Sequence, residues 1–336
     1  MRVFLLGLLL AAVSLAAKSM DVYFIDTEGG KATLIVSPSG QTLLIDTGYG
    51  GNHLRDANRI VAAAKLAGVK QIDYLLITHF HEDHAGGVPQ LAARLPIKHF
   101  IDHGPNTESG PAPDALYRSY KDTWGASEHT VAAPGYKIPI KGIDVEVLAA
   151  NGEAIKSPLK GAGAANPVCA STDKKADVTT ENPRSVGSVI TFGKFRMLDL
   201  GDLTWNKELA LICPNNLIGT VDVYATSHHG NDDSGSPALI SAIQPKVAIM
   251  NNGMTKGGAA SAWRTLRGSP RFVDFWQLHF AVAGGKANNV DDQFIANPGT
   301  DDSKDQGNWI KLSAQSDGSF TVTNSRNNLS KSYKER

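Results

Sequence analysis

Residues 78–87 read THFHEDHAGG, and the fold can be inferred outward from this segment. Three histidines and two carboxylates lie within six positions of it, directly after the apolar run IDYLLI at residues 72–77. Imidazole together with carboxylate favours zinc, manganese or iron over calcium or magnesium. The apolar run predicts a strand, and alternate side chains of an extended backbone share one face. His79 and His81 can therefore bind one metal ion from the end of that strand.

The second half of the motif predicts a second metal ion. Gly86 and Gly87 mark a turn from the strand into a helix, and this turn directs Asp83 and His84 away from the first pair. The alternative is a polar loop that is rich in histidine but binds no metal. The H-x-H-x-D-H spacing at a strand end favours the metal site over that alternative.

The motif resembles the signature of the metallo-β-lactamase superfamily, and further segments extend the resemblance. They are DTG at 46–48, GD at 201–202 and SHHG at 227–230, each after an apolar run. Within the superfamily they most resemble the hydrolase domain of bacterial competence (DNA-uptake) channel proteins and their secreted relatives. That domain also begins with a strand ending in Asp and a Gly-rich turn, here FIDTEGG at 24–30. The resemblance covers about residues 20–250.

This resemblance implies an α/β fold, the four-layer αββα sandwich, with metals at one edge of its two sheets. It also implies a binuclear centre whose ligands come from three segments: His79, His81, Asp83, His84, Asp202 and His228. The first two histidines would form site one, Asp202 would bridge both sites, and the others would form site two. We expect two divalent transition metals, zinc first, with manganese or iron as alternatives. A metal-bridging hydroxide would be the nucleophile, with Asp83, Asp202 and His229 in catalytic roles.

Two adjacent histidines compete for the last ligand position of site two. Superfamily members place this histidine two residues past the end of the strand, which favours His228 as the ligand. His229 would then orient the metal site or face the substrate. The alternative is that both belong to a polar turn.

Three other polar residues, Asp46, Asp26 and His279, are candidates for supporting roles at the site. Asp46 is expected to orient a ligand histidine by accepting its free N–H, although Asp-Thr-Gly is also common in turns. Asp26 shares this ambiguity. His279 could reach the rim of the site, with a partly buried structural histidine as the alternative.

Site one departs from the superfamily pattern. Most members supply a third histidine from a segment before a hairpin, and here residues 180–188 contain none. Competence-type domains carry Asn and Ser in this region. Asn182, water or substrate would complete the site, and His103 is another candidate.

The N-terminus predicts export. Arg2 precedes the apolar run 3–17, and Ser14-Leu15-Ala16 fits the small-x-small pattern before a cleavage site. An uncleaved membrane anchor is the alternative. We therefore expect a signal peptide at 1–17 and a periplasmic or secreted protein with no stable membrane insertion after its removal. Residues 18–336 would form a single domain with an irregular insertion at about 150–183.

Charge and cysteine content restrict the partners. The mature chain would hold 32 basic and 33 acidic side chains, so charge does not indicate a nucleic-acid partner, although a local basic groove stays compatible. A small-molecule or phosphoester substrate is the expected partner. Cys169 and Cys213 could form a disulfide in an oxidising compartment, or they could be two buried thiols.

Regular elements are expected on both sides of the motif. Apolar residues at helical spacing predict helices at 54–66, 88–95, 114–124, 237–243 and 259–266. The runs 186–192 and 195–200 predict a hairpin around Gly193-Lys194, and 309–314 and 320–323 predict another around Asp317-Gly318.

The sequence favours a secreted, binuclear metal-dependent hydrolase of phosphodiester or related phosphoester bonds. A bridging aspartate with competence-type motifs suits in-line displacement at phosphorus. A lactone or thioester hydrolase with the same ligands is the first alternative, and a non-catalytic binding module on the same scaffold is the second. A true β-lactamase is disfavoured, because those enzymes lack this bridging aspartate and keep the third histidine.

Overall fold

The computed structural model describes residues 18–301 and 304–334. The expected signal peptide at 1–17 lies outside these residues. Among the residues that the structure describes, no helix combines the length and the apolar character needed to cross a membrane.

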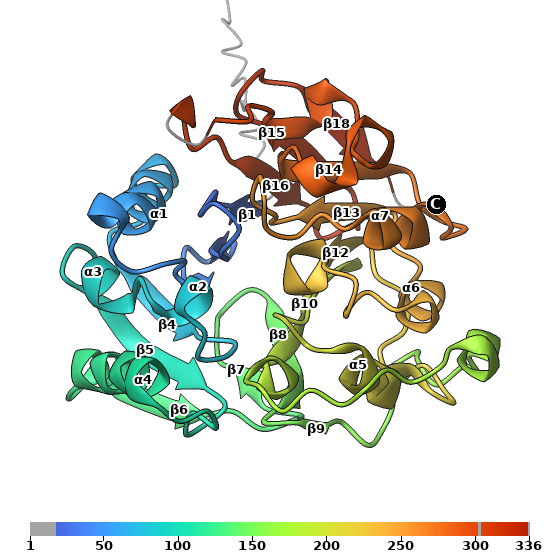
Figure 1. Ribbon diagram of the computed structural model, residues 1–336, viewed down its shortest axis with the longest axis horizontal. Helices are drawn as coiled ribbons and strands as arrows, with labels where there is room; N and C mark the ends of the chain where they lie inside the picture. Colours follow the sequence, from blue (N-terminus) through green and yellow to red (C-terminus); the bar gives the residue numbers. More distant parts are fainter. Residues whose placement is uncertain (1–17, 302–303, 335–336) are drawn as a thin grey trace, which may run out of the picture.

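Two large β-sheets form the centre of the fold (Figure 1). The first sheet contains, in spatial order, β18 (Ser330–Tyr333), β17 (Phe320–Asn324), β16 (Ile310–Ala314), β1 (Met20–Phe24), β2 (Thr33–Val36), β3 (Thr42–Ile45), β4 (Ile72–Leu76), β5 (Ile97–Asp102) and β6 (Glu128–Val131). The second contains β15 (Ile295–Asn297), β14 (Asp274–His279), β13 (Val247–Met250), β12 (Val223–Ala225), β11 (Phe195–Asp199), β10 (Gly187–Phe192), β8 (Asp144–Ala150) and β7 (Lys137–Ile138), with β9 (Glu153–Ala154) paired to β8.

Helices cover the outer face of each sheet. Apolar side chains of α1 (Arg55–Leu66), α3 (Val88–Ala92) and α4 (Pro111–Trp124) pack on the first sheet, beside the one-turn helix α2 (Glu82–Ala85). Those of α5 (Trp205–Ile212), α6 (Pro237–Ile243) and α7 (Ala260–Arg267) pack on the second sheet. The result is the four-layer αββα sandwich that the sequence predicts.

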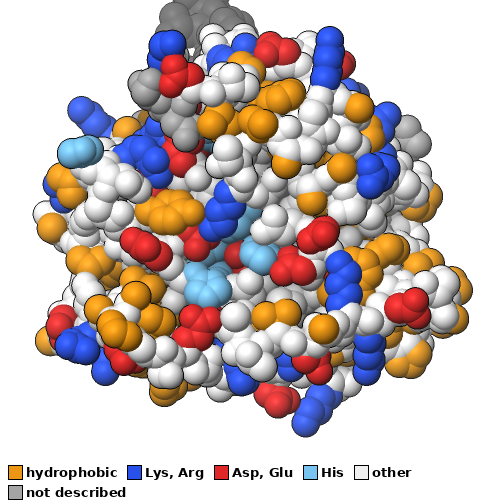
Figure 2. All heavy atoms as spheres, viewed as in Figure 1, with side chains coloured by type: hydrophobic (Ala, Val, Ile, Leu, Met, Phe, Trp, Pro, Cys, Tyr) orange, Lys and Arg blue, Asp and Glu red, His pale blue; other side chains and the backbone are white. Residues whose placement is uncertain are grey.

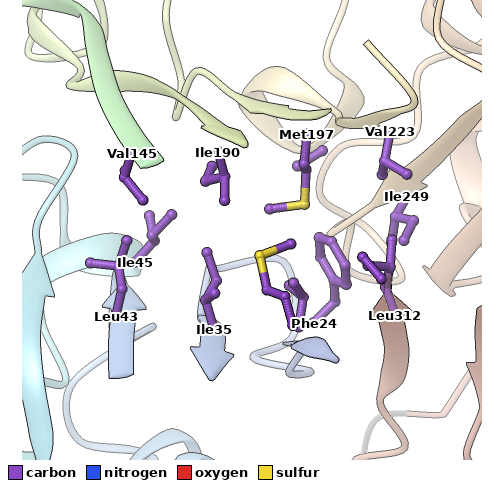
Figure 3. Close-up of a cluster of buried hydrophobic side chains, with 14 of the residues drawn as sticks. Phe24, Ile35, Leu43, Ile45, Val145, Ile190, Met197, Val223, Ile249 and Leu312 are labelled. Carbon is purple, nitrogen blue, oxygen red and sulfur yellow. The ribbon is translucent and has the colours of Figure 1, made fainter. Parts of the chain in front are cut away.

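The two inner sheet faces form the main hydrophobic core (Figure 3). Side chains from the first sheet interdigitate with those from the second, and the labelled ones are Phe24, Ile35, Leu43, Ile45, Leu312, Val145, Ile190, Met197, Val223 and Ile249. The strands that carry them are short and mostly buried on both faces, which explains their nearly continuous apolar sequences. This contact fixes how the two sheets face each other.

The middle strands of both sheets run parallel, which positions the functional loops. In the first sheet β3, β4, β5 and β6 are parallel, and in the second β11, β12, β13, β14 and β15 are parallel. The carboxyl ends of parallel strands lie at the same edge of a sheet, where α/β folds commonly place ligands. The loops after β3, β4, β11, β12 and β13 therefore leave from one edge.

Most predicted helices and both hairpins are present, with shifted ends. The helix expected at 114–124 begins earlier, because Pro111 and Pro113 are tolerated in a first helical turn. The helix expected to reach residue 95 ends at Ala92, where the N–H groups of Arg94 and Leu95 both bond to Leu91 O in a tightened turn. The edge strand β18, in which polar residues alternate, was not predicted from the sequence.

Residues 150–183 contain little regular structure beyond β9 and the 3₁₀ turn at Pro167–Ser171. A disulfide joins Cys169 in this stretch to Cys213 at the end of α5. The pairing settles the choice that the sequence left open. It ties the stretch to the helical layer of the second sheet.

Replacing both cysteines by serine should destabilise the protein. The disulfide links positions 44 residues apart, and removing it frees a long loop in the unfolded chain. We expect the free energy of unfolding to fall by about 2–4 kcal/mol, measured by urea denaturation. An unchanged unfolding midpoint would show that this cross-link contributes nothing to stability.

Candidate metal centre

Loops from both sheets meet at the edge where the parallel strands end. Figure 2 shows histidine side chains in a hollow near the middle of one face, with acidic and basic side chains around it. His79, His81, Asp83 and His84 follow β4, Asp202 follows β11, and His228 and His229 follow β12. The predicted ligands therefore come together from one segment at 79–84 and from two segments that lie more than 100 residues further along the chain.

The tightest group consists of Asp83, His84, Asp202 and His229. One ligand atom from each lies within 4.8 Å of those of the other three. His84 Nε2 lies 3.1 Å from Asp83 Oδ2, 3.2 Å from Asp202 Oδ2 and 3.3 Å from His229 Nε2. All four side chains are buried or nearly so, so a cation there would be shielded from bulk water. Two imidazoles and two carboxylates suit a divalent transition metal.

His79 and His81 form a second pair beside this group. His79 Nε2 and His81 Nδ1 lie 3.0 Å apart, and His79 Nε2 lies 4.0 Å from Asp202 Oδ2. His79 is fully buried, whereas the His81 side chain is partly exposed. Asp202 thus faces both the pair and the tight group, as a bridging ligand must.

The histidines are oriented by protein oxygens that accept hydrogen bonds from one ring nitrogen. The pairs are His84 Nδ1 with Asp46 Oδ2 (2.7 Å), His229 Nδ1 with the Asn251 carbonyl (3.2 Å), His81 Nε2 with Glu108 Oε1 (3.2 Å) and His228 Nδ1 with Asp233 Oδ1 (2.6 Å). A ring nitrogen that donates in this way leaves the other nitrogen free to bind a metal. The arrangement therefore selects the tautomer that each ligand would need.

Asp46 has the contacts expected of an orienting residue. Besides His84, its carboxylate accepts hydrogen bonds from Thr78 N and Thr78 Oγ1, both at 2.8 Å. Its backbone has a positive φ of 61°, a conformation that aspartate tolerates better than most residues. The Asp-Thr-Gly turn and the orienting role are thus combined in one residue.

The electrostatics of the tight group suit a cation. Burial by itself lowers the pKa of the His84 imidazole, but the carboxylates of Asp202, Asp83 and Asp46 raise it well above its ordinary value. The same negative potential attracts a metal ion to His84 Nε2. Asp202 Oδ1 is buried and lacks a hydrogen-bond partner among the described residues, as expected of an oxygen that faces a metal. The four residues of the tight group therefore fit one divalent transition metal, and a second metal at His79 and His81 stays a prediction.

The structure reverses the order predicted for the adjacent histidines. His229, not His228, joins Asp83, His84 and Asp202. Both histidines have left-handed backbone conformations, with φ of 47° and 53°, within the 3₁₀ turn Ser227–Gly230. This sharp turn carries the first side chain to the rim and the second inward, so counting from the strand end selects the wrong one.

His228 lies close to Asp202, although it is not part of the tight group. Its Nε2 lies 3.6 Å from Asp202 Oδ2 and 3.4 Å from Asn182 Nδ2. Asn182 is buried, and its Oδ1 has no hydrogen-bond partner among the described residues. Both side chains therefore face the region where the superfamily's third site-one histidine is missing.

His103 does not reach the metal ligands, contrary to its candidacy as a site-one ligand. Its Nε2 lies 2.8 Å from Glu181 Oε2, and its ring packs on Phe80. Glu181 also accepts a hydrogen bond from Phe80 N at 3.0 Å. His103 thus supports the histidine motif indirectly, through its contacts with Glu181 and Phe80.

His279 is also a structural histidine, the alternative to its suggested place at the rim. It is buried, and its Nε2 lies 2.6 Å from Asp26 Oδ1. Asp26 in turn pairs with Arg59, which also contacts Glu28 and Asp305. This network lies outside the group of Asp83, His84, Asp202 and His229. One ligand atom each from Asp26, Glu28, His279 and Asp305 lies within 4.8 Å of the others, with Arg59 as the neighbouring cation.

Three further residues of the site were not predicted from the sequence. Glu181 anchors the histidine motif; burial raises the pKa of its carboxyl, but hydrogen bonds from His103 and Thr107 outweigh this and lower it to about 2. Glu108 orients His81. Lys256, in the loop after β13, bonds to Asp83 Oδ2. Only Lys256 had a sequence signal, because its Gly-rich loop follows a predicted strand.

Comparisons with known proteins identify one superfamily. Residues 25–161 match the sequence profile of the Metallo-beta-lactamase superfamily. Over 109 residues the chain is 33% identical to atrochrysone carboxyl ACP thioesterase dmxR1 of Cryptosporiopsis sp. (strain 8999), a match that covers 32% of each protein. Over 241 residues it is 23% identical to Recombination protein 2 of Haemophilus influenzae, covering 71% of this chain and 25% of that protein.

The chain spans a third or less of the length of these curated relatives. The alignment with Recombination protein 2 is consistent with the resemblance to competence-type hydrolase domains. Among solved structures, the metallo-beta-lactamase fold protein YhfI from Bacillus subtilis aligns with a TM-score of 0.44 and 11% identity, covering 77% of this chain and 96% of YhfI.

Asp46→Asn should weaken metal binding. The amide cannot accept hydrogen bonds from His84 Nδ1 and Thr78 in the same way, so the ring loses its fixed orientation. We expect a loss of about 10- to 100-fold in zinc affinity, measured by competition with a chromogenic chelator. Asp73→Asn is the control, because Asp73, near the start of β4, likewise accepts a hydrogen bond from a threonine backbone N–H, that of Thr42. Equal affinity of both variants would contradict the orienting role.

The two adjacent histidines should differ in metal retention. His229→Ala removes a member of the tight group, whereas His228→Ala removes a side chain at its rim. We expect the first variant to lose a larger share of bound zinc after dialysis against a weak chelator, measured by inductively coupled plasma mass spectrometry. Greater loss from His228→Ala would restore the assignment made from the sequence.

Proposed function

The chain carries a metallo-β-lactamase superfamily domain, and we propose that it is a metal-dependent hydrolase of phosphodiester or related phosphoester bonds. The observation that carries this proposal is the position of Asp202. Its carboxylate lies between the His79/His81 pair and the group of Asp83, His84 and His229. Such a bridge supports two cations side by side, the arrangement that suits displacement at phosphorus.

The metals, when bound, would supply a nucleophilic water at neutral pH and offset negative charge on the attacking and leaving oxygens. The protein supplies the geometry. Asp46 and the Asn251 carbonyl hold His84 and His229 in place, and burial of the ligands keeps bulk water away from them. Preorganised groups of this kind need little rearrangement during the reaction.

A cavity of about 600 Å³ beside His81 supports a small-molecule substrate. Its walls include apolar side chains such as Phe80 and Leu116, together with the carboxylates of Glu82 and Glu108. It contains no lysine or arginine. A polyanionic nucleic acid would be repelled there, so the cavity favours a substrate with an apolar or weakly charged leaving group.

Thioester hydrolysis is the second candidate. Two fungal relatives, 33% and 29% identical over 109 residues, are named atrochrysone carboxyl ACP thioesterases. The apolar side of the cavity would suit an acyl group, and the same metal ligands serve both reactions. Lactone hydrolysis uses this chemistry too.

We also propose that the protein is exported. The sequence pattern of residues 1–17 supports this, and the Cys169–Cys213 disulfide suits an oxidising compartment such as the periplasm.

A small substrate panel tests the proposal. We expect zinc-loaded protein to hydrolyse bis-p-nitrophenyl phosphate in preference to a lactone, nitrocefin and an aryl thioester. Asp202→Ala should lower kcat by more than about 100-fold, beyond the loss typical of an outer-sphere partner. Chelation should abolish the activity and zinc should restore it.

Preference for the thioester or lactone would reject the phosphodiesterase assignment. A protein that retains less than one metal ion per chain and turns over none of these substrates would instead support a non-catalytic binding module.

A further inference from the structure

A lysine reaches the metal centre from the loop between β13 and α7. Lys256 Nζ bonds to Asp83 Oδ2 and lies 3.2 Å from the Tyr49 hydroxyl. The ammonium also lies 5.4 Å from the centre of the Tyr49 ring. About a third of the lysine side chain is exposed, so it faces both the metal ligands and the open hollow. The hollow that contains the histidines thus has a cation next to the predicted metal ligand Asp83.

The loop that carries Lys256 is held rigidly. Gly253 N bonds to the Lys256 carbonyl at 2.9 Å, and Gly258 N bonds to the His229 carbonyl at 2.9 Å. Gly257 has a φ of +76°, and a Cβ there would lie 2.1 Å from the His229 carbonyl oxygen, so only glycine fits. The loop is therefore fixed to the backbone of a metal ligand. This attachment limits how far the Lys256 backbone can move relative to His229.

The turn at Gly29 packs against the aliphatic part of the Lys256 side chain. Gly29 has a φ of +85°, and a Cβ there would lie 2.9 Å from Lys256 Cβ. The loop containing Gly29 is in turn held by the Asp26–Arg59 pair and the Asp26–His279 contact. The loop that carries Lys256 and the loop that packs against its side chain are thus both anchored in the fold.

A purely structural ion pair is a weak explanation for this arrangement. The Lys256–Asp83 pair is largely removed from water, and the cost of desolvating two charges offsets most of their mutual attraction. Asp83 is also a metal ligand, so divalent cations beside it would repel the ammonium. The Lys256 ammonium becomes favourable beside the metal ions when a bound anion offsets the positive charge of both.

We propose that Lys256 and Tyr49 form an anion-binding subsite beside the metal centre, and that the substrate carries a negatively charged oxygen next to its scissile bond. This inference rests on the proposed hydrolase function and narrows its substrate class. A phosphodiester has a charged non-bridging oxygen for the ammonium, while lactones and simple thioesters have none. Lysine is a common phosphate ligand because it presents a compact charge, and a tyrosine hydroxyl can donate a second hydrogen bond.

Binding of methylphosphonate to zinc-loaded protein tests the subsite without turnover. We expect Lys256→Met to weaken binding by about 10- to 100-fold in isothermal titration calorimetry, the range for a lost hydrogen bond to a charged group. Lys256→Arg should retain most of the affinity, and Tyr49→Phe should show a smaller loss. Lys331→Met is the matched control, because Lys331 also pairs with an aspartate, Asp274, at partial exposure.

Kinetics supply the second measurement. Lys256→Met should lower kcat/KM for bis-p-nitrophenyl phosphate at least about tenfold more than for the neutral ester p-nitrophenyl acetate. Zinc content should equal that of the wild type. Equal losses on both esters, or loss of zinc with loss of activity, would show that Lys256 only supports the ligands and would overturn the subsite.

The two proposals can fail separately. If wild-type protein binds methylphosphonate through Lys256 but does not hydrolyse the phosphodiester, the phosphodiesterase assignment fails and the subsite stands. If the phosphodiester is hydrolysed and methylphosphonate binding does not depend on Lys256, the subsite alone is overturned.

Discussion

The face-to-face packing of two sheets is the constraint on which the site depends. The apolar inner faces interlock, and this contact aligns the carboxyl ends of β4 and β11 at one edge. Asp83 and His84 leave the first sheet there, and Asp202 and His229 leave the second. No local interaction could bring these groups within hydrogen-bonding distance. The hydrophobic effect, which is not directional, thus fixes a polar centre whose geometry must be accurate.

Backbone strain at the centre is borne by the same framework. Asp46, His228 and His229 all have positive φ, an uncommon conformation for residues other than glycine. Such conformations persist where surrounding structure holds them, and they gather at functional sites. Here the strain has a visible result, because the left-handed turn at 228–229 aims one histidine inward and leaves the other facing Asn182.

Charge is distributed unevenly around the centre. The cavity beside His81 contains carboxylates and apolar walls, while Lys256 lies at Asp83 and Tyr49 and is absent from the cavity lining. A substrate with an anionic reacting group and an uncharged or apolar leaving group would satisfy both regions. This asymmetry is a local property, and the nearly neutral net charge of the whole chain conceals it.

The fold class, the strand that carries the histidine motif, and most helices could be predicted from local sequence patterns and the family resemblance. This was possible because residues 72–87 combine a buried strand with a fixed spacing of ligands, and both are local patterns. The expected contact of Asp46 with a ligand histidine also followed from the ordered motifs, through the family resemblance.

Three features became visible only in the folded chain. They are which of two adjacent histidines joins the predicted metal ligands, the pairing of His103 and His279 with carboxylates elsewhere, and the position of Lys256 beside Asp83. Each of these depends on backbone conformation or on partners 78 to 253 residues away, as for His103 with Glu181 and His279 with Asp26. Spacing along a chain reports side-chain direction within a strand or helix. It carries no such information through a left-handed turn or across the gap between two sheets.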